Sequence, residues 1–334
     1  MFFDEKVVAG LRGRDYIETR DWSDEELEVA LELAADLKYK FRNGIPHAYL
    51  PNKTIFLLFF DKSTRTRNSF EAGATQLGAH AHFIDAETSQ LAHGESPKDM
   101  GVILSSYGHA IAIRHDLVPG EGNTLMREVA KHSEVPVLNM QCDIYHPFQC
   151  LADLMTIKEK VKDTQRLKVS IIWAYATTHK KPISVPLSQI LLFPRYGMDV
   201  TLAYPEGYDL PDWAIKQAEE NAKANGGSLK ITHNQEEAYE GAHVVIPKNW
   251  GDWVTNPDPA VINPRLEANK HWKCTEKMMS LADPDVMYMH ALPADRKNEV
   301  EDSVIDGPHS IVYDEAENRI HTAKAVMTLT MGGK

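Results

Sequence analysis

Two arginines and three hydroxyl side chains occur together in this chain, in the run Ser-Thr-Arg-Thr-Arg at residues 63–67. An apolar, strand-like run at residues 54–60 precedes them, and residues 68–77 are compatible with a helix. Unpaired backbone N–H groups and the helix dipole make a helix N-terminus attractive to anions, and arginine forks add bidentate contacts. We therefore expect a phosphate-binding loop; a capped helix with exposed arginines is the alternative.

The whole molecule cannot attract such an anion, because its formal net charge is −12 at pH 7. The same charge would repel nucleic-acid phosphates, so we expect no nucleic-acid partner. An anionic substrate must instead be held by local positive charge. The candidates are four arginines: Arg65, Arg67, Arg114 and Arg296.

Composition narrows the class of protein further. No apolar run is long enough to span a bilayer and residues 1–6 do not read as a signal peptide, so we expect no membrane association and a cytoplasmic location. The 3 cysteines include no Cys-x-x-Cys pair. This pattern supports neither a disulfide framework nor a zinc site, and we expect no metal.

Helix and strand patterns alternate along the 334 residues, which predicts α/β architecture with parallel sheets in two domains. Ser23 is the expected N-cap of a helix over residues 24–34, and residues 315–331 should form a terminal helix. Expected strands fall into two groups, at residues 54–60, 80–84, 110–113 and 135–140, and at residues 169–174, 200–203, 243–246 and 286–289.

Four segments, in order, resemble motifs of the aspartate/ornithine carbamoyltransferase family. They are Ser-Thr-Arg-Thr-Arg at residues 63–67, His-Pro-Phe-Gln at 146–149, His-Ala-Leu-Pro at 290–293 and Asp-Glu-Ala-Glu-Asn-Arg at 314–319. The resemblance implies a carbamoyl-phosphate domain at residues 1–150, completed by a C-terminal helix at 316–334, and an amino-acid domain at 151–315. It also implies transfer of a carbamoyl group to an amine, without a cofactor, in a homotrimer with shared active sites.

The family's site residues carry over by motif. In the resembling enzymes the loop binds the phosphate, the arginine after the third strand reaches the phosphate and the carbonyl oxygen, and the histidine donates to that oxygen. A glutamine contacts the carbamoyl nitrogen, and a neighbouring subunit lends a loop like residues 89–96. The resemblance thus implies a carbamoyl-phosphate site made of Ser63, Thr64, Arg65, Thr66, Arg114, His146, Gln149, Arg296 and the neighbour's His93. Of these, Arg65, Arg114 and His146 would be catalytic, and Arg67 would shape the loop.

Several segments differ from the motifs of the ornithine enzymes, and these differences bear on which amine accepts the carbamoyl group. Lys-Asn-Trp-Gly at residues 248–251 replaces the ornithine enzymes' Asp-x-x-x-Ser-Met-Gly, and residues 173–186 form a longer, proline-bearing loop. Both resemble the knotted branch, typified by N-acetylornithine and N-succinylornithine carbamoyltransferases, so we expect a trefoil knot in the second domain. The expected second-substrate residues are Asp143, Lys248, Trp250, Ala291 and Leu292.

Alternatives stay open for three of these residues and for the activity. Asp143 either holds an amine or braces its loop, and Trp250 is either a pocket wall or a core aromatic. Ala291 stands where the family motif has Cys, and the change reflects either altered specificity or reduced activity. The activity could instead be that of an ordinary ornithine carbamoyltransferase or a non-catalytic binding relative. A P-loop phosphotransferase is excluded, because the sequence has no Gly-x-x-x-x-Gly-Lys-[Ser/Thr] run.

Overall fold

The computed structural model describes residues 5–116, 118–252 and 258–332, in two compact units. The first unit is Met1–Met155 with Glu317–Lys334, and the second is Thr156–Ala316. The chain leaves the first unit within α6 (Pro147–Lys160) and returns within α13 (Val312–Met331). The divisions expected at residues 150 and 316 fall inside these same two helices. Residues 333–334 of the expected terminal helix lie outside the described residues.

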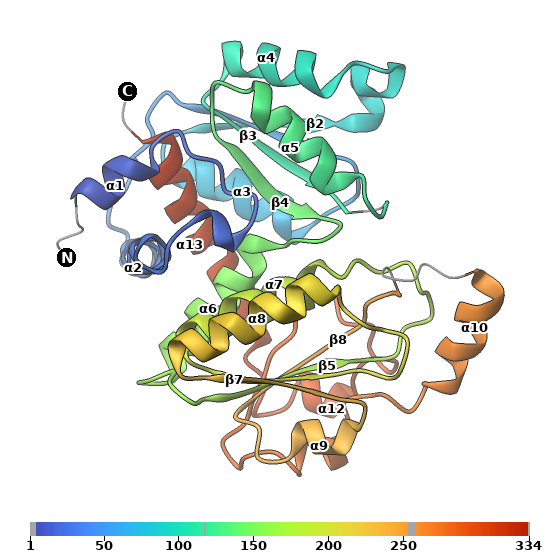
Figure 1. Ribbon diagram of the computed structural model, residues 1–334. Helices are drawn as coiled ribbons and strands as arrows, with labels where there is room; N and C mark the ends of the chain where they lie inside the picture. The colour runs from blue at the N-terminus through green and yellow to red at the C-terminus, as the bar shows by residue number, and fades with distance from the viewer. Residues whose placement is uncertain (1–4, 117, 253–257, 333–334) are drawn as a thin grey trace. The chain divides into compact units, whose positions relative to one another are not determined.

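The first unit contains a four-stranded parallel sheet in the order β2-β1-β3-β4. Its strands are β1 (Thr54–Phe59), β2 (His80–Asp85), β3 (Ala110–His115) and β4 (Val137–Cys142). Helices α3 and α13 lie on one face of this sheet, and α4 and α5 on the other (Figure 1). The helices of this unit before α6 are α1 (Glu5–Leu11), α2 (Asp24–Arg42), α3 (Arg65–Gln76), α4 (Pro97–Tyr107) and α5 (Gly122–His132).

Local sequence explains these elements. Strands β1 and β3 are almost wholly buried, as is typical of parallel strands covered on both faces. The Ser23 side chain caps α2 in a reciprocal pair with Glu26, and Ser96 accepts from the backbone of Asp99 at the start of α4. The predicted N-cap at Ser23 is confirmed. Because the strand order reverses between β1 and β3, their carboxyl ends form the switch point at which ligands bind such sheets.

The second unit has a five-stranded parallel sheet in the order β7-β6-β5-β8-β9, with its switch point between β5 and β8. Its strands are β5 (Lys168–Trp173), β6 (Asp199–Ala203), β7 (Ser228–Thr232), β8 (Val244–Lys248) and β9 (Met287–Tyr288). Its helices are α7 (Ser184–Leu192), α8 (Asp212–Asn225), α9 (Gln235–Tyr239), α10 (Pro259–Ala268), α11 (Glu276–Met279) and α12 (Asp302–Ile305).

The expected α/β class with two parallel sheets is confirmed, whereas one strand was missed. Strand β7 is a largely exposed edge strand, so its sequence lacks the apolar run by which its neighbours were identified. The trefoil knot stays a prediction. The two segments that differ from the ornithine enzymes, residues 173–186 and 248–251, are in contact, because the backbone N–H of Gly251 donates to the carbonyl of Lys181.

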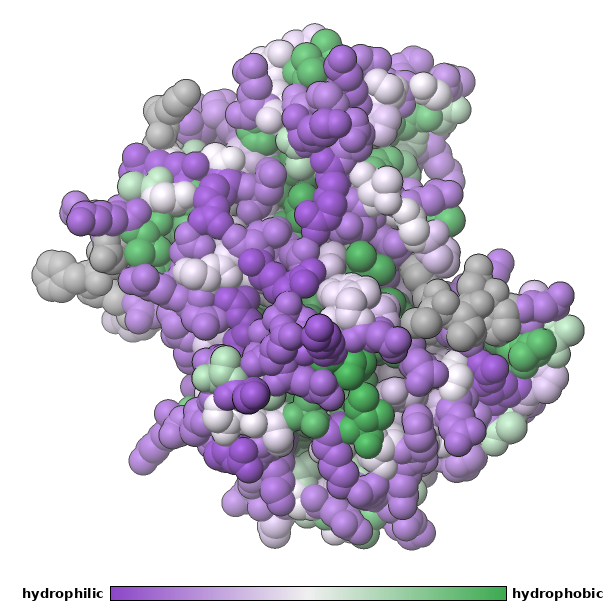
Figure 2. Space-filling model, in the orientation of Figure 1, coloured by the Kyte–Doolittle hydropathy of each residue, from purple (hydrophilic) through white to green (hydrophobic). Residues whose placement is uncertain are grey.

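On the face shown in Figure 2, hydrophilic residues predominate and hydrophobic residues form small, separate groups. Across the described residues, every helix is too short or too polar to cross a membrane.

Candidate functional site

The Ser-Thr-Arg-Thr-Arg run lies at the switch point of the first sheet. Strand β1 ends at Phe59, which pairs with Arg114 of β3, so the loop after β1 lies beside Arg114. Helix α3 begins at Arg65, three residues earlier than the sequence predicted. Thr64 precedes it with helical backbone angles and makes no side-chain cap hydrogen bond. Its hydroxyl therefore does not perform the capping role that was the alternative interpretation of this run.

Thr66 is the centre of the polar contacts around this loop. Its Oγ1 atom accepts from Nη1 of Arg114 and from Nη2 of Arg319, each at 3.1 Å. Thr66 is only 2% exposed. A hydroxyl oxygen has two lone pairs and one proton, so with both lone pairs engaged Thr66 can offer a ligand only its proton. That is the polarity an anion requires.

Three guanidinium groups thus belong to one small region. Burial and the nearby charge of Arg114 lower the pKa of Arg65 from its ordinary value. Arg319 of α13 is buried and also donates to Oε1 of Gln149, whose Nε2 donates to Asp153 at 2.7 Å. The amide of Gln149 is therefore held in a fixed orientation beside the arginines. Like charges brought together in this way make the region a strong site for an anion.

A buried carboxylate offsets part of this charge. Asp116 follows β3 and accepts from Nη2 of Arg114 at 3.0 Å. Arg114 therefore makes two directional contacts, one to Thr66 and one to Asp116, which hold the plane of its guanidinium.

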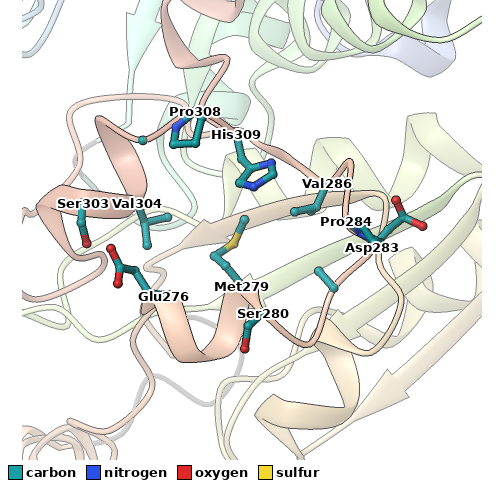
Figure 3. A pocket seen from close by; sticks show the side chains of 12 residues that line it. Glu276, Met279, Ser280, Asp283, Pro284, Val286, Ser303, Val304, Pro308 and His309 are labelled. Atoms are coloured by element: carbon teal, nitrogen blue, oxygen red, sulfur yellow. The ribbon is translucent and has the colours of Figure 1, made fainter.

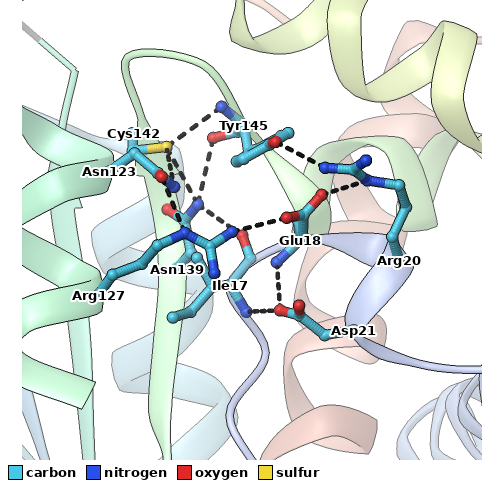
Figure 4. A network of polar contacts seen from close by, with 9 residues as sticks. All are labelled: Ile17, Glu18, Arg20, Asp21, Asn123, Arg127, Asn139, Cys142 and Tyr145. Carbon is cyan, nitrogen blue, oxygen red and sulfur yellow. Dashed lines mark hydrogen bonds and ion pairs between the residues drawn. The ribbon is translucent and has the colours of Figure 1, made fainter. Parts of the chain in front are cut away.

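His146 is almost fully buried at the turn before α6, and a polar network braces that turn (Figure 4). Tyr145 donates its backbone N–H to Sγ of Cys142, and its hydroxyl accepts from Nη2 of Arg20 at 2.9 Å. Asn139 donates to the same sulfur, at 3.3 Å. The imidazole therefore follows a segment whose position is fixed by neighbouring polar groups.

The network extends to the segment before α2. Glu18 is 6% exposed and forms ion pairs with Arg20 and Arg127, the latter at 2.6 Å (Figure 4). The carboxylate of Asp21 accepts from the backbone of Ile17 and Glu18. Because these residues are far apart in sequence, no local motif could have indicated the network.

Asp143 is engaged by backbone donors. Its two carboxylate oxygens accept from the N–H groups of Gly120 and Asn123, each at 2.8 Å, and the side chain is 1% exposed. The structure thus shows the bracing role that sequence analysis left open beside the amine-binding one.

Arg67, which was expected to shape the loop, is engaged by two neighbouring side chains. Arg67 donates to Glu71 at 2.8 Å and its guanidinium carbon lies 3.6 Å from the ring centre of Phe83, contacts that hold the loop's shape. A hollow of about 420 Å³ beside this loop is lined in part by Ser63, Thr64 and Arg67. His93 is exposed on the short 3-10 helix Gln90–His93, and its contribution to a neighbouring subunit stays a prediction.

In the second unit, Lys248 ends β8 at the switch point, paired with Trp173 of β5. Its Nζ atom lies 3.7 Å from Oε1 of Glu299, which is 0% exposed. His290 lies 3.3 Å from the same oxygen through Nε2, and the N–H of Asn249 donates to it at 2.9 Å. Burial alone would raise the pKa of Glu299, but Lys248, His290 and backbone N–H donors hold it well below its ordinary value. Lys248 and Glu299 are therefore a charged pair at the end of the strand.

The other expected second-substrate residues have different surroundings. Trp250 is 2% exposed and its indole N–H donates to the carbonyl of Tyr208, which is the core environment that sequence analysis left open. Ala291 and Leu292 are half-buried after β9, and the N–H of Leu292 donates to Nδ1 of His290 at 2.9 Å.

Arg296 was expected to supply the last cation of the phosphate site. In the second unit its exposed guanidinium donates to Asp302 at 2.8 Å and to both oxygens of Asp306. These two carboxylates satisfy it, and its role toward phosphate stays a prediction.

A separate cavity of about 380 Å³ lies between α11 and the loop after α12 (Figure 3). Met279, Val286 and Val304 line it, and His309 stands at its side. It contains none of the residues that sequence analysis selected.

Asp116, Arg319 and Glu299 belong to these groups but were not predicted as site residues. Arg319 had a usable signal, since it ends the Asp-Glu-Ala-Glu-Asn-Arg segment. Asp116 and Glu299 had none, because a single carboxylate near an arginine or a lysine in sequence is common on surfaces.

Comparison with known proteins agrees with this geometry. Residues 14–159 match the aspartate/ornithine carbamoyltransferase carbamoyl-P binding domain, and residues 167–330 match the Asp/Orn binding domain. The chain is 38% identical to ornithine carbamoyltransferase of Halalkalibacterium halodurans over 99% of this chain and 98% of that one. It is 35% identical to the putative carbamoyltransferase YgeW of Escherichia coli K12, over 93% of this chain and 88% of that one.

Solved structures show the same likeness. Ornithine carbamoyltransferase from Pyrococcus furiosus has a TM-score of 0.87 at 37% identity, covering 97% of this chain and 99% of that one. An acetylornithine transcarbamylase complexed with acetylcitrulline has a TM-score of 0.85 at 31% identity, covering 96% and 100%. This chain belongs to the aspartate/ornithine carbamoyltransferase family.

Proposed function

We propose that this protein transfers the carbamoyl group of carbamoyl phosphate to the amine of an amino-acid-like acceptor, giving a ureido product and phosphate. The observation that carries the proposal is the convergence of Arg114 and Arg319 on Thr66, with Arg65 close enough to Arg114 for their charges to interact, in a chain whose net charge is −12. Such a local focus of positive charge suits a compact dianion.

The chemistry follows from the positions of these groups. Phosphate is already a good leaving group, so positioning and preorganised dipoles can supply most of the acceleration without a covalent intermediate or cofactor. Ser63, Thr64, Arg65 and Thr66 hold the phosphate. Arg114 and His146 polarise the carbonyl oxygen, stabilising the negative charge that develops there during attack. Gln149, held by Arg319 and Asp153, orients the carbamoyl nitrogen.

The second unit supplies the acceptor site. Lys248 at the switch point offers a cation to a carboxylate or carbonyl of the acceptor, and Leu292 offers its backbone carbonyl to the attacking amine. Ornithine enzymes and an acetylornithine transcarbamylase are both similar to this chain, so the acceptor is of that class. The Lys-Asn-Trp-Gly segment and the long loop at residues 173–186 favour an N-acylated or otherwise altered acceptor over ornithine itself. A cytoplasmic homotrimer with His93 shared between subunits completes the proposal.

A colorimetric ureido assay with carbamoyl phosphate and a panel of amines tests this function. The panel contains ornithine, its N-acyl derivatives, putrescine and small diamino acids. Arg65→Ala should lower turnover at least about 100-fold, the typical effect of losing one charge-stabilising donor, whereas Arg12→Ala, at an exposed residue, should not. Undiminished activity in Arg65→Ala would contradict the phosphate-clamp assignment.

A non-catalytic binding protein is the second candidate, because Ala291 replaces the cysteine of the family motif. It predicts calorimetric binding of carbamoyl phosphate with no ureido product from any amine. Product formation excludes it.

A further inference from the structure

The carboxylate of Asp116 has an unusual position for a group beside an anion site. One oxygen, Oδ2, accepts from Nη2 of Arg114 at 3.0 Å. The other, Oδ1, is buried and has no hydrogen-bond partner among the described residues. The side chain is 7% exposed, so water does not compensate for it freely. A negative charge in these surroundings is held there mainly by Arg114.

Burial and a neighbouring carboxylate disfavour the ionised form of Asp116. Burial raises the pKa of Asp116 from its ordinary value, Arg114 lowers it, and the carboxylate of Asp61 raises it further. A bound phosphate would add more negative charge on the same arginine. Asp116 and the ligand therefore compete for one guanidinium, although Asp116 also keeps that guanidinium in place beside Thr66.

We propose that Asp116 is a positioning residue with a second effect: it fixes Arg114 for ligand binding, and its charge limits how tightly the pocket retains inorganic phosphate. This inference rests on the proposed function. Two guanidinium groups on one hydroxyl, with Arg65 near Arg114, would hold a released dianion strongly, and a fixed internal counter-ion weakens that hold while leaving the geometry intact. The arrangement favours release of the phosphate product without loss of the clamp's orientation.

The test compares Asp116→Asn with Asp116→Ala, using calorimetric titration with inorganic phosphate. Asparagine keeps an oxygen that accepts from Arg114 but removes the charge. Phosphate should therefore bind Asp116→Asn about fivefold to 30-fold more tightly, the effect of one charge on a phosphate of charge −1 to −2 at roughly 8 Å in an effective dielectric of about 40. Alanine also removes the acceptor, so Arg114 loses its position and Asp116→Ala should bind phosphate less tightly than Asp116→Asn does.

Tighter binding is informative because structural damage can only weaken it. Asp99→Asn, at an exposed carboxylate in the first turn of α4, removes the same charge away from the arginines and should leave phosphate affinity within twofold (about the precision of titration) of the original. Unchanged or weaker phosphate binding by Asp116→Asn would overturn the inference. If the unmodified protein binds neither phosphate nor carbamoyl phosphate, the proposed function itself fails, and the two failures are thereby distinguished.

Discussion

Arg319 and Thr66 are 253 residues apart in sequence, yet Nη2 of Arg319 lies 3.1 Å from Oγ1 of Thr66. The same guanidinium reaches Gln149, so one side chain of the terminal helix orients two groups of the proposed phosphate site. The terminal helix is therefore part of the site's construction as well as part of the first unit's core.

Replacing Arg319 with lysine should distinguish the effect of its two hydrogen bonds, to Thr66 and Gln149, from the effect of its positive charge. Lysine keeps the positive charge but lacks the planar fork that reaches two acceptors at once. We expect the KM for carbamoyl phosphate to rise about tenfold or more in Arg319→Lys, since a hydrogen bond from a charged group contributes about 1.5–3 kcal/mol. Steady-state kinetics measures this, with Arg42→Lys, an exposed arginine of α2 paired with Glu317, as the matched control. An unchanged KM would show that Arg319 does not support the site.

Lys248→Met should affect the acceptor and not carbamoyl phosphate. The change removes the cation proposed to bind the acceptor and leaves Glu299 with His290 and backbone donors alone. We expect a rise of about tenfold or more in the acceptor's KM, the contribution of a charged hydrogen bond, together with a stability loss of about 1–3 kcal/mol. Kinetics and urea unfolding measure the two effects. Glu299→Gln, which keeps an acceptor oxygen, is the companion variant. Equal losses of acceptor and carbamoyl-phosphate binding in Lys248→Met would indicate structural damage.

The fold could be predicted from the sequence because its strands are marked by apolar runs. Strands β1, β3 and β5 are buried on both faces, so their sequences are nearly continuous apolar runs that indicate buried strands. Strand β7 could not be found in this way, because an exposed edge strand is under little pressure to be apolar. The edge strand of the second sheet therefore could not be predicted from the sequence.

Some residues of the candidate site could be predicted from the sequence and others could not. Ser63, Arg65 and Thr66 were found because their types and spacing are dense within one short segment. Glu299 acts through Lys248, a partner distant in sequence that folding brings to it, and no spacing rule records such a pairing. Asp116 is only two residues from its partner Arg114, but that spacing is too common to mark a site. Asp143 and Trp250 were predicted as substrate-binding residues because their side-chain types suit a ligand. In the structure both side chains are hydrogen-bonded to backbone groups.

The three cysteines should be unreactive in the folded protein. Cys142, Cys150 and Cys274 are each 0% exposed and unpaired with one another. Burial raises the pKa of both Cys142 and Cys274 to about 12, so few thiolates exist near neutral pH. Titration with a thiol-specific chromogenic reagent at pH 8 should detect almost no thiol in the native state and all of them in denaturant. A thiol that reacts rapidly without denaturant would contradict the burial described here.

The contribution of Lys324 in α13 to stability should rise with pH in the alkaline range. This lysine is 0% exposed, its Nζ atom donates to Gln76 at 2.9 Å, and burial lowers its pKa from 10.5 to about 8. Below pH 8 the folded and unfolded states both carry the proton, and between pH 8 and 10.5 only the unfolded state binds it. Deprotonation therefore favours folding in that window, by up to about 1.4 kcal/mol per pH unit.

Other groups also titrate between pH 8 and 10.5, and the buried thiols act in the opposite direction, so the contribution of Lys324 must be taken as a difference. Urea unfolding of the original protein and of Lys324→Met at several pH values gives that difference. The stability of the original protein relative to the variant should increase as the pH rises from 8 to 10.5. Lys131→Met, at an exposed lysine of α5, should run parallel to the original. If Lys324→Met also ran parallel to it, Lys324 would have to be charged in the folded protein throughout this range, and the contacts to Gln76 and His47 would then outweigh its burial.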